Sequence, residues 1–565
     1  MIELRSAILD PTENARCLKE HLRLSTESAA ILDRRKFVPE SAKSLLFLPK
    51  LRPFVESSIL GEDAKVATRL LEKSKHIGIF CDYDCDGILS SEVARHVFSG
   101  LGKKHTIFLP ERRESYGLNR SALRDLQKKG VDTLITADCG TSNIAEILYA
   151  KTLGMTVIVT DHHEYSSRPP ADAFLNPMYT EYASLCGCST FGMALQSLSA
   201  ELFQQVQPFL AIATIGDIVP MLQESRIFVS DFFDFPRFPG ILDAAFDGVT
   251  DFDLLSVAFN VVPKINALSR MGQARTVLKF PKQTKQMVAA QLTQLNDSRK
   301  ALQKELVTKL RTQISESDPI IVVNIPPDVI TDGHGFFGLV ASRLAEKYRK
   351  PAFVGHIEKG RFKGSGRSNG AVNIHSLLHL AQASCDIEFG GHSVALGFSA
   401  KTVDQFKAAV NTAYTESLDE ISIAVIDDTD FSATLDDLSS MAAPFAELFP
   451  FGNKFPFLTL SLSGLEYSKF KERDFFSTFT YGDSVIYLPV TLGASNSPEK
   501  ILSASVSLVG TVDSKLKYVV NDLDVEVAGR CVRASQIPRR FSKPASKPKF
   551  IRKPSVASKK LASLL

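Results

Sequence analysis

The stretch from Ile77 to Gly87 constrains the fold and the chemistry of this 565-residue chain more than any other segment. A short apolar run ends in three carboxylates, Asp82, Asp84 and Asp86, at alternating positions, and a helical pattern follows them. Such an order predicts the start of a βα unit, which places ligands at the carboxyl ends of its strands. Crowded carboxylates repel one another there, and divalent cations would relieve the repulsion. From this stretch alone, an ordinary acidic turn or an isolated calcium loop is an equally good interpretation.

Two later strand candidates end in residue types that bind metals. One apolar run leads into Asp138, and the next leads into Asp161, His162 and His163; a third, helix-like apolar segment leads to Asp217. The alternation of strand and helix predicts an α/β domain with a mostly parallel, covered sheet. Because the carboxyl ends of parallel strands converge, these side chains can share one site with the first acidic cluster. Carboxylates combined with imidazoles suit manganese, with magnesium as the second choice.

Four motifs resemble those of the DHH phosphoesterase superfamily in order and spacing: Asp-Tyr-Asp-Cys-Asp-Gly (82–87), Ala-Asp-Cys-Gly (137–140), Thr-Asp-His-His (160–163) and Ile-Gly-Asp-Ile-Val-Pro (215–220). Other segments are similar to the RecJ-like branch, whose members are 5′-to-3′ exonucleases specific for single-stranded DNA. These segments are 263–270, 295–300, 335–343, 363–368, 389–392 and 449–453. The resemblance implies a DHH domain, a long connecting helix, a second α/β (DHHA1-like) domain and a C-terminal OB-like β domain.

The resemblance also implies a catalytic site with two divalent cations, Mn²⁺ preferred or Mg²⁺. Its expected metal ligands are Asp82, Asp84, Asp138, His162 and Asp217, and His163 completes the catalytic set. Asp138 is the expected bridge, with Asp82 on one metal and Asp84, His162 and Asp217 on the other. His163 is expected at the scissile phosphate or a metal-bound water. Asp86 and Asp161 are expected to orient ligands.

A second set of residues carries over from the resemblance as contacts to the phosphates of the substrate. It consists of Arg112, Arg270, Ser365, Arg367, Ser368 and His392. The chain departs from the family pattern at three points. Lys264 stands where arginine is usual, His334 is shifted by one position, and the loop before Tyr116 is one residue short, which leaves Arg113 as the alternative to Arg112.

The patterns divide the chain into six predicted parts. They are a helical lead-in (1–71), the DHH catalytic domain (72–275), the connecting helix (276–318), the DHHA1-like domain for phosphate and substrate (319–425), the OB-like domain for nucleic acid (426–532) and a basic disordered tail (533–565).

Charge and cysteine content limit the class of protein. The net charge is +3, but the segment from Val527 onward holds eleven Lys or Arg and no Asp or Glu, so the rest of the chain carries about 3 − 11 = −8. The eight cysteines include no Cys-x-x-Cys pair, which favours reduced thiols over a disulfide framework or a zinc module. The sequence shows no signal peptide and no apolar run long enough to cross a bilayer, so we expect a cytoplasmic protein without a membrane partner. A nucleoid-associated protein, or a viral protein in a bacterial host, is compatible with this expectation.

The expected activity is hydrolysis of single-stranded DNA from a 5′ end, in recombination, repair or replication. A single-strand-binding protein or a helicase is an expected partner. Two alternatives stay open: a DHH phosphodiesterase for short oligonucleotides or cyclic dinucleotides, and a non-catalytic replication scaffold. The OB-like domain argues against a tiny substrate, and the intact set of ligands argues against a scaffold.

Overall fold

We describe the fold from a computed structural model of the chain. The described residues are 7–8, 10–42, 46, 57–114, 116–180, 182–250, 252–315, 317–326, 335–348, 350–368, 372–391, 393–416, 430–441, 444, 447–451, 458–463, 471–472, 476–481, 484–489, 500–512, 515–527 and 530–533. His334, His392 and the basic tail after Arg533 lie outside these ranges. Among the described residues, no helix has both the length and the apolar character needed to cross a membrane.

A five-stranded parallel sheet with the order β2-β1-β3-β4-β5 forms the first domain. Its strands are β1 (Ile77–Cys81), β2 (His105–Phe108), β3 (Thr133–Ala137), β4 (Thr156–Thr160) and β5 (Ala173–Leu175). From β1 the chain passes to β2 on one side and then to β3 on the other, so the order reverses beside β1. Sheets of this kind bind ligands at such a reversal. The prediction of an α/β domain with a mostly parallel sheet is confirmed.

Alternating side chains of these strands enter two separate hydrophobic cores. Ile79 and Ile135 pack into the core on one face, whereas Phe80 and Leu134 pack into the core on the other. Burial on both faces explains why the strands read as continuous apolar runs rather than as alternating patterns. The helices of this domain are α5 (Glu62–Lys73), α6 (Cys85–Gly100), α7 (Arg120–Lys128), α8 (Ile144–Thr152), α9 (Gly187–Gln196), α10 (Ala200–Gly216), α11 (Gln223–Asp234), α12 (Ile241–Ala245), α13 (Leu254–Ser256) and α14 (Val262–Arg270), with the short turns η1 (Ser57–Leu60), η2 (Arg112–Glu114), η3 (Val257–Val261) and η4 (Ala274–Lys282).

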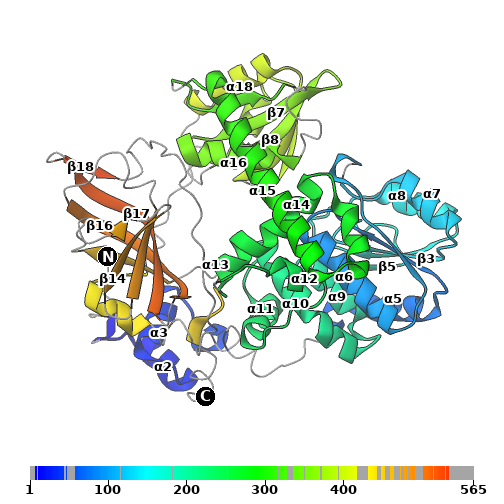
Figure 1. Cartoon of the computed structure of the whole chain (residues 1–565), viewed down its shortest axis with the longest axis horizontal. Coiled ribbons are helices and arrows are strands. Elements are labelled where there is room, and N and C mark those ends of the chain that lie inside the picture. The colour runs from blue at the N-terminus through cyan, green and yellow to red at the C-terminus, as the bar shows by residue number, and fades with distance from the viewer. Residues whose placement is uncertain are drawn as a thin grey trace.

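One long helix, α15 (Lys285–Lys309), leads from the first domain to the second, and Figure 1 shows it rising from the region of α14 to the second sheet. Thr284 caps its start, because the Thr284 hydroxyl accepts from the amide of Met287. Val288, Leu292 and Leu295 lie buried on its inner face and join the core of the first domain. The prediction of a long connecting helix is confirmed, but the helix is shorter than the predicted range 276–318: η4 precedes it, and it ends in a short turn, η5 (Leu310–Gln313).

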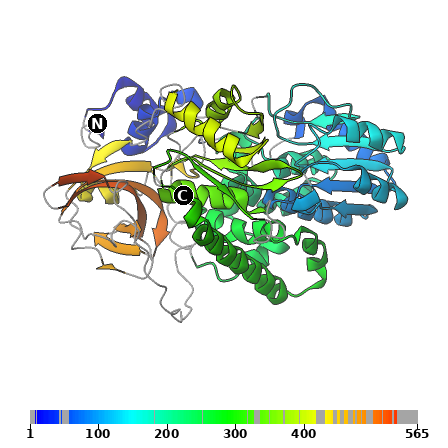
Figure 2. The same cartoon turned by 90° about the horizontal axis from the view of Figure 1, so that it is seen from above.

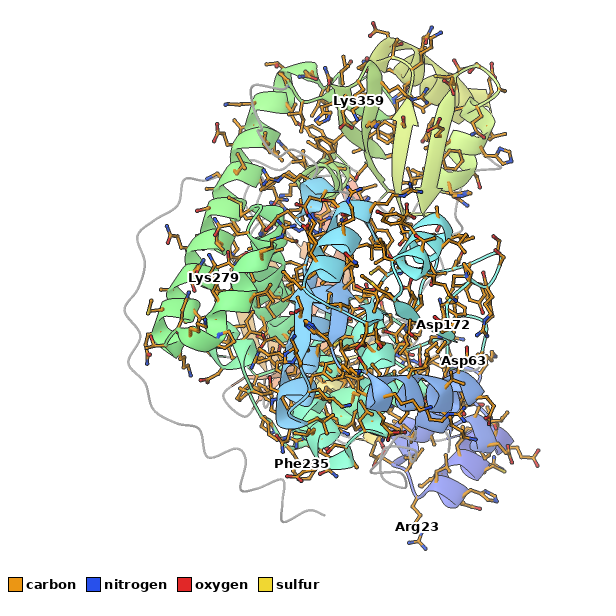
Figure 3. All side chains as sticks on the ribbon, turned by 90° about the vertical axis from the view of Figure 1, so that its right-hand side faces the viewer. Arg23, Asp63, Asp172, Phe235, Lys279 and Lys359 are labelled. Carbon is orange, nitrogen blue, oxygen red and sulfur yellow. The ribbon has the colours of Figure 1, made fainter. Side chains whose placement is uncertain are left out.

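The second domain is a five-stranded mixed sheet in the order β6-β7-β8-β10-β9. Only the β6–β7 pair is parallel among these strands; the other pairs are antiparallel. In Figure 3 the second domain lies at the top, marked by Lys359 in the turn between β7 and β8. Phe235, at the end of α11 in the first domain, lies low in the same view. The elements are β6 (Ile321–Asn324), α16 (Phe337–Tyr348), β7 (Ala352–Glu358), β8 (Arg361–Arg367), α17 (Ile374–Ala381), β9 (Ile387–Gly391), β10 (Ala395–Ala400) and α18 (Val403–Glu416).

A third, mostly antiparallel sheet with the order β11-β12-β16-β17-β15-β14-β13, and with β18 beside β17, forms the C-terminal part. The turn to β-rich structure is confirmed, and the finer assignment to an OB-like fold stays a prediction. Its elements are β11 (Phe431–Ala433), η7 (Leu435–Met441), β12 (Leu458–Ser463), β13 (Lys471–Glu472), β14 (Phe476–Tyr481), β15 (Ser484–Pro489), β16 (Lys500–Val512), β17 (Lys515–Val527) and β18 (Arg530–Arg533).

The first two helices, α2 (Glu13–Leu22) and α3 (Thr26–Arg34), lie beside the third sheet rather than beside the first (Figures 1 and 2). Arg35 binds Asp430 through two hydrogen bonds of 2.8 Å in a largely buried ion pair. The buried Arg226 of α11 donates to the carbonyls of Leu448 and Phe449, which precede β12. The N-terminal helices thus contact the start of the third sheet, and the first domain contacts the segment that leads into β12.

Candidate metal centre

The metal-ligand residue types meet at the carboxyl edge of the first sheet. Asp82 directly follows β1, Asp138 directly follows β3, and Asp161 begins the segment after β4. Asp84 caps α6, where its Oδ1 accepts from the amides of Asp86 (3.1 Å) and Gly87 (3.3 Å). Convergence of parallel strands therefore brings three separate motifs together, as the sequence predicts.

Two glycines make this convergence possible by allowing close backbone approaches. A Cβ on Gly87 would lie 2.2 Å from the carbonyl oxygen of Asp82, where the first turn of α6 passes the end of β1. A Cβ on Gly187, at the start of α9, would lie 2.5 Å from the Cβ of Asp138. Both contacts are far below van der Waals distance, so a larger residue at either position would displace a candidate ligand.

Three overlapping groups of side chains bring their ligand atoms within 4.8 Å of one another. The groups are Asp82, Asp84 and Asp138; Asp138, His162 and His163; and Asp86, His162 and Asp217. Asp138 and His162 each belong to two of the groups, which matches the expected place of Asp138 between two cations. Asp84 lies with Asp82, whereas Asp86 lies with His162 and Asp217.

Asp86 is held firmly by the protein itself. Its two carboxylate oxygens accept from the amides of Gly187 and Cys188, both at 2.8 Å, at the N-terminus of α9. Burial, followed by the charge of Asp84, raises the pKa of Asp86 to about 7. These two amide bonds link α6 to α9, and they fit the expected orienting role of Asp86.

Asp82 and Asp138 instead carry buried oxygens without a hydrogen bond. No described residue donates a hydrogen bond to the buried Oδ1 atoms of these two residues, although buried polar groups normally have a donor. Burial raises the pKa of Asp82, Asp138 and Asp217 well above the usual value, and neighbouring carboxylates, Asp84 for Asp82 and Asp86 for the other two, raise it further. A divalent cation would supply the missing positive partner, so the residues fit a metal centre.

The two adjacent histidines have opposite properties. The Nε2 atom of His162 lies 3.3 Å from Oδ1 of Asp138 and 3.6 Å from Oδ2 of Asp217. Burial, then the neighbouring His163, lowers the pKa of His162 to about 4, which keeps its imidazole neutral and able to bind a metal. Burial by itself would lower the pKa of His163 as well, but the hydrogen bond and charge of Asp161 outweigh it and raise that pKa to about 9.

Asp161 and Tyr116 both contact Nδ1 of His163. One oxygen of Asp161 accepts from Nδ1 of His163 (2.7 Å), and the other accepts from the amide of Thr141 (2.9 Å). The hydroxyl of Tyr116 lies 3.0 Å from Nδ1 of His163 and donates to the carbonyl of Asp138 at 3.2 Å. No sequence pattern marks Tyr116 as part of this site, because only a loop of defined conformation brings a tyrosine to this position.

Three of the expected phosphate contacts converge where the second domain meets the first. Arg270 donates to the carbonyl of Gly335 at 2.7 Å, and a Cβ on Gly335 would lie 3.4 Å from Cδ of Arg112. A Cβ on Gly338, in the first turn of α16, would lie 2.6 Å from Nη2 of Arg367. Burial, then the nearby Arg112 and Arg299, with Arg367 adding to them, lowers the pKa of Arg270 to about 9. Mutually repelling guanidinium groups at an interdomain contact are suited to an anion.

For the other expected phosphate-binding residues that it describes, the structure shows the positions of the backbone. Ser365 lies in β8, in register with Val354 of β7, and the amide of Ser368 donates to the carbonyl of Val394. His392 lies outside the described residues. Arg113 lies with Arg112 in η2, but it is Arg112 that stacks over the ring of Tyr83 at 4.3 Å, beside the acidic turn. Lys264 donates to the carbonyls of Ala245 and Asp247 and so serves the packing of α14.

Two family models and several known proteins are similar to this chain. The model of the DHH family, N-terminal domain, matches residues 76–216, and that of the DHHA1 domain matches residues 335–416. The chain is 26% identical over 474 residues to the single-stranded-DNA-specific exonuclease RecJ of Bacillus subtilis, covering 78% of this chain and 59% of that protein. It is 29% identical over 358 residues to RecJ of Thermus thermophilus, covering 60% and 52%.

A solved structure is similar to this chain in fold. The crystal structure of Thermus thermophilus RecJ in complex with Mn²⁺ superposes with a TM-score of 0.71 at 23% identity, and the match covers 90% of this chain and 77% of that one. In sequence, the chain aligns with between half and three fifths of the length of the two curated relatives.

Proposed function

We propose that this chain, whose residues 76–216 match the DHH family model and whose residues 335–416 match the DHHA1 domain model, is a metal-dependent exonuclease. Its proposed reaction is hydrolysis of phosphodiester bonds of single-stranded DNA in the 5′-to-3′ direction. The names of the two curated relatives, both single-stranded-DNA-specific exonucleases, support the choice of substrate.

One observation carries the proposal: a carboxylate face and a guanidinium face meet at the same interdomain position. The carboxylate face contains buried, unpaired oxygens of Asp82 and Asp138, which suit cations. The guanidinium face contains Arg112, Arg270 and Arg367, which suit phosphate. The charge of Asp84 acts on Arg270, so the two faces are electrostatic neighbours. A phosphodiester held together with divalent cations has the charge distribution that such a site needs.

In this proposal two cations, Mn²⁺ or Mg²⁺, are held by Asp82, Asp84, Asp138, His162 and Asp217. When bound, such cations activate water and stabilise the charge that develops on the phosphate. His162 contributes a neutral imidazole, and Asp86 keeps the first turn of α6 against α9. His163 directs its Nδ1 proton to Asp161, which leaves Nε2 to face a phosphate oxygen or a water. Arg112 and Arg270 hold the phosphate in place from the opposite side.

We assign recognition of the strand terminus to the end of β8. Arg367 carries a fork of donors that matches two oxygens of a terminal phosphate, and Ser365 and Ser368 flank it with hydroxyl groups. A terminal phosphate bound here would define the strand end from which hydrolysis proceeds. His392 is proposed as a further contact on the basis of the sequence alone.

The remaining proposals concern the outer parts of the molecule. The β-rich residues 426–532 are proposed to bind the single strand beyond the metal centre, in the manner of OB-like domains. The basic tail is proposed to hold DNA electrostatically, because the segment from Val527 onward, which includes the tail, carries eleven Lys or Arg and no Asp or Glu. A single-strand-binding protein or a helicase is the proposed partner, and DNA recombination, repair or replication in the cytoplasm is the proposed setting.

The test is digestion of end-labelled single and double strands, of both DNA and RNA, with Mn²⁺ or Mg²⁺. We expect rapid release of the label from 5′-labelled single-stranded DNA, slow release from 3′-labelled strands, and no release with a chelator. Degradation of dinucleotides and cyclic dinucleotides alone would instead indicate a small-substrate phosphodiesterase. Exclusive degradation from 3′ ends would contradict the proposed direction.

A further inference from the structure

The loop that follows η2 brings Tyr116 to the edge of the candidate metal centre. The Tyr116 side chain is 40% exposed, but its hydroxyl contacts two residues that belong to different strand ends. It lies 3.2 Å from the carbonyl oxygen of Asp138, after β3, and 3.0 Å from Nδ1 of His163, after β4. The ring also packs edge-on against the His163 ring at 5.3 Å.

The directions of these hydrogen bonds follow from the available donors and acceptors. Asp161 already accepts from the amides of Thr141 and His162, and its Oδ1 lies 2.7 Å from Nδ1 of His163, so Nδ1 must carry a proton. The Tyr116 oxygen is then a second acceptor for that proton. The hydroxyl proton of Tyr116 is directed to the carbonyl of Asp138, which can only accept.

Asp138 needs such support because its backbone is strained. Its φ of +64° lies in the left-handed region, which residues other than glycine adopt uncommonly. The conformation turns the carboxylate toward Asp82 and His162 at the centre of the site. A donor on the Asp138 carbonyl stabilises this arrangement of the backbone.

The loop itself is held in place next to Tyr116. Gly117 has a φ of +84°, and a Cβ there would lie 2.5 Å from Oδ1 of Asn143, which precedes α8. The same Oδ1 accepts from the amide of Leu118 at 3.1 Å. Gly117 thus packs closely against Asn143, and Leu118 is hydrogen-bonded to it. These contacts give the neighbouring Tyr116 hydroxyl a defined position against the strand ends.

We propose that Tyr116 is a positioning residue of the metal centre: its hydroxyl joins the Asp138 backbone to the His163 ring. It sets the direction of the Asp138 carboxylate and the orientation of the His163 ring. The consequence for turnover rests on the proposed exonuclease function. The consequence for metal affinity rests only on the geometry of Asp138.

The test compares Tyr116→Phe with the unchanged full-length protein in two measurements. The first is Mn²⁺ affinity, from the signal of free Mn²⁺ in electron paramagnetic resonance during titration of the metal-free protein. The second is kcat and KM for a 5′-phosphorylated single strand. Loss of a group that orients a ligand typically costs 10–100-fold, so we expect about tenfold weaker Mn²⁺ binding and about tenfold lower kcat with an unchanged KM.

Tyr179→Phe is the matched control. Tyr179 lies after β5 in the same domain, is 62% exposed, and packs against Tyr165. Its variant should keep wild-type Mn²⁺ affinity and kcat, so a defect specific to Tyr116→Phe is not a general effect of removing a tyrosine hydroxyl. Should Tyr116→Phe fail to fold, Asn143→Ala, which frees the loop, provides the same comparison: weaker Mn²⁺ binding supports the proposal, and wild-type affinity contradicts it.

Wild-type Mn²⁺ affinity and wild-type kcat in a folded Tyr116→Phe protein would overturn the proposal. A raised KM with both of these unchanged would overturn it as well, because it would assign the hydroxyl to DNA binding. If the wild-type protein degrades no DNA at all, the exonuclease proposal fails, whereas the Mn²⁺ titration still decides the role of Tyr116.

Discussion

The two faces of the candidate site are built in different ways. The carboxylate face comes mainly from the ends of strands β1, β3 and β4 of one sheet and the start of α6, and Asp217 at the end of α10 completes it. The guanidinium face comes from three separate elements, with Arg112 in η2, Arg270 at the end of α14 and Arg367 at the end of β8 in another domain. The first face depends on one sheet, and the second depends on how two domains meet.

The electrostatic consequences are opposite as well. Burial and mutual repulsion raise the pKa values of Asp82, Asp138 and Asp217, whereas burial and mutual repulsion lower the pKa of Arg270. Each face therefore lacks counter-charges. The carboxylate face lacks cations, and the guanidinium face lacks anions. In the proposed function a metal and a phosphate would bind together and supply these charges, and each face can be tested by itself.

The largest effect should come from the carboxylate face. Asp138→Asn keeps the size of the side chain but removes the charge that lies between the two groups of candidate ligands. We expect cleavage of single-stranded DNA to fall by at least about a thousandfold, since the cations stabilise charge in the transition state. Binding of single-stranded DNA in Ca²⁺ should change by less than about threefold, because the arginines remain.

Asp172→Asn is the control for this variant. Asp172 belongs to the same domain, but it pairs with Lys151 at 2.8 Å and is in none of the three ligand groups; Figure 3 labels it near Asp63. Its variant should cleave DNA at the wild-type rate. Manganese-dependent turnover by Asp138→Asn at a rate near that of the wild type would remove Asp138 from the metal centre.

The carboxylate face could be predicted from the sequence because its information is local. Each motif places a carboxylate or an imidazole directly after an apolar run, and parallel topology brings those positions together. The apolar runs predicted as β1, β3 and β4 are confirmed by the structure, and so is the long helix α15. Resemblance to a family added the second domain, which the residue patterns alone left as short strands and glycine-rich turns.

The parts that could not be predicted depend on contacts between distant segments. Nothing in the local pattern of Gly187 shows that it passes within contact distance of Asp138, and nothing near Tyr116 shows its hydroxyl at two strand ends. The ion pair of Arg35 with Asp430 joins residues that are 395 positions apart. Such contacts arise from packing, which a single sequence does not display.

Protons should compete with the metal on the carboxylate face. Without a metal, the pKa values of Asp82, Asp138 and Asp217 are raised, and that of Asp86 is about 7. Metal binding favours the ionised carboxylates, so it must release protons, and affinity must fall as the pH falls through these raised pKa values. We expect the Mn²⁺ affinity to drop about 30-fold between pH 8 and pH 6. This ratio is larger than the change of about tenfold that corresponds to one pKa unit. Calorimetry in buffers of different ionisation enthalpy measures the released protons; equal affinity at both pH values would contradict the expectation.

The smallest effect should come from the guanidinium face, and it should be specific to one substrate feature. Arg367→Ala removes a fork of donors whose Nη2 lies beside Gly338. We expect the preference for a 5′-phosphate over a 5′-hydroxyl to fall by about tenfold, the value of one charge-assisted hydrogen bond. The rate of cleavage of 5′-hydroxyl strands should change little.

Arg361→Ala is the matched control, because Arg361 begins the same strand and pairs with Asp386 at 2.8 Å. Both variants lose one arginine from β8, so a general loss of positive charge would weaken them alike. Equal preference for 5′-phosphate in the two variants would separate Arg367 from terminus recognition and leave the guanidinium face to hold only the phosphate beside the metal centre.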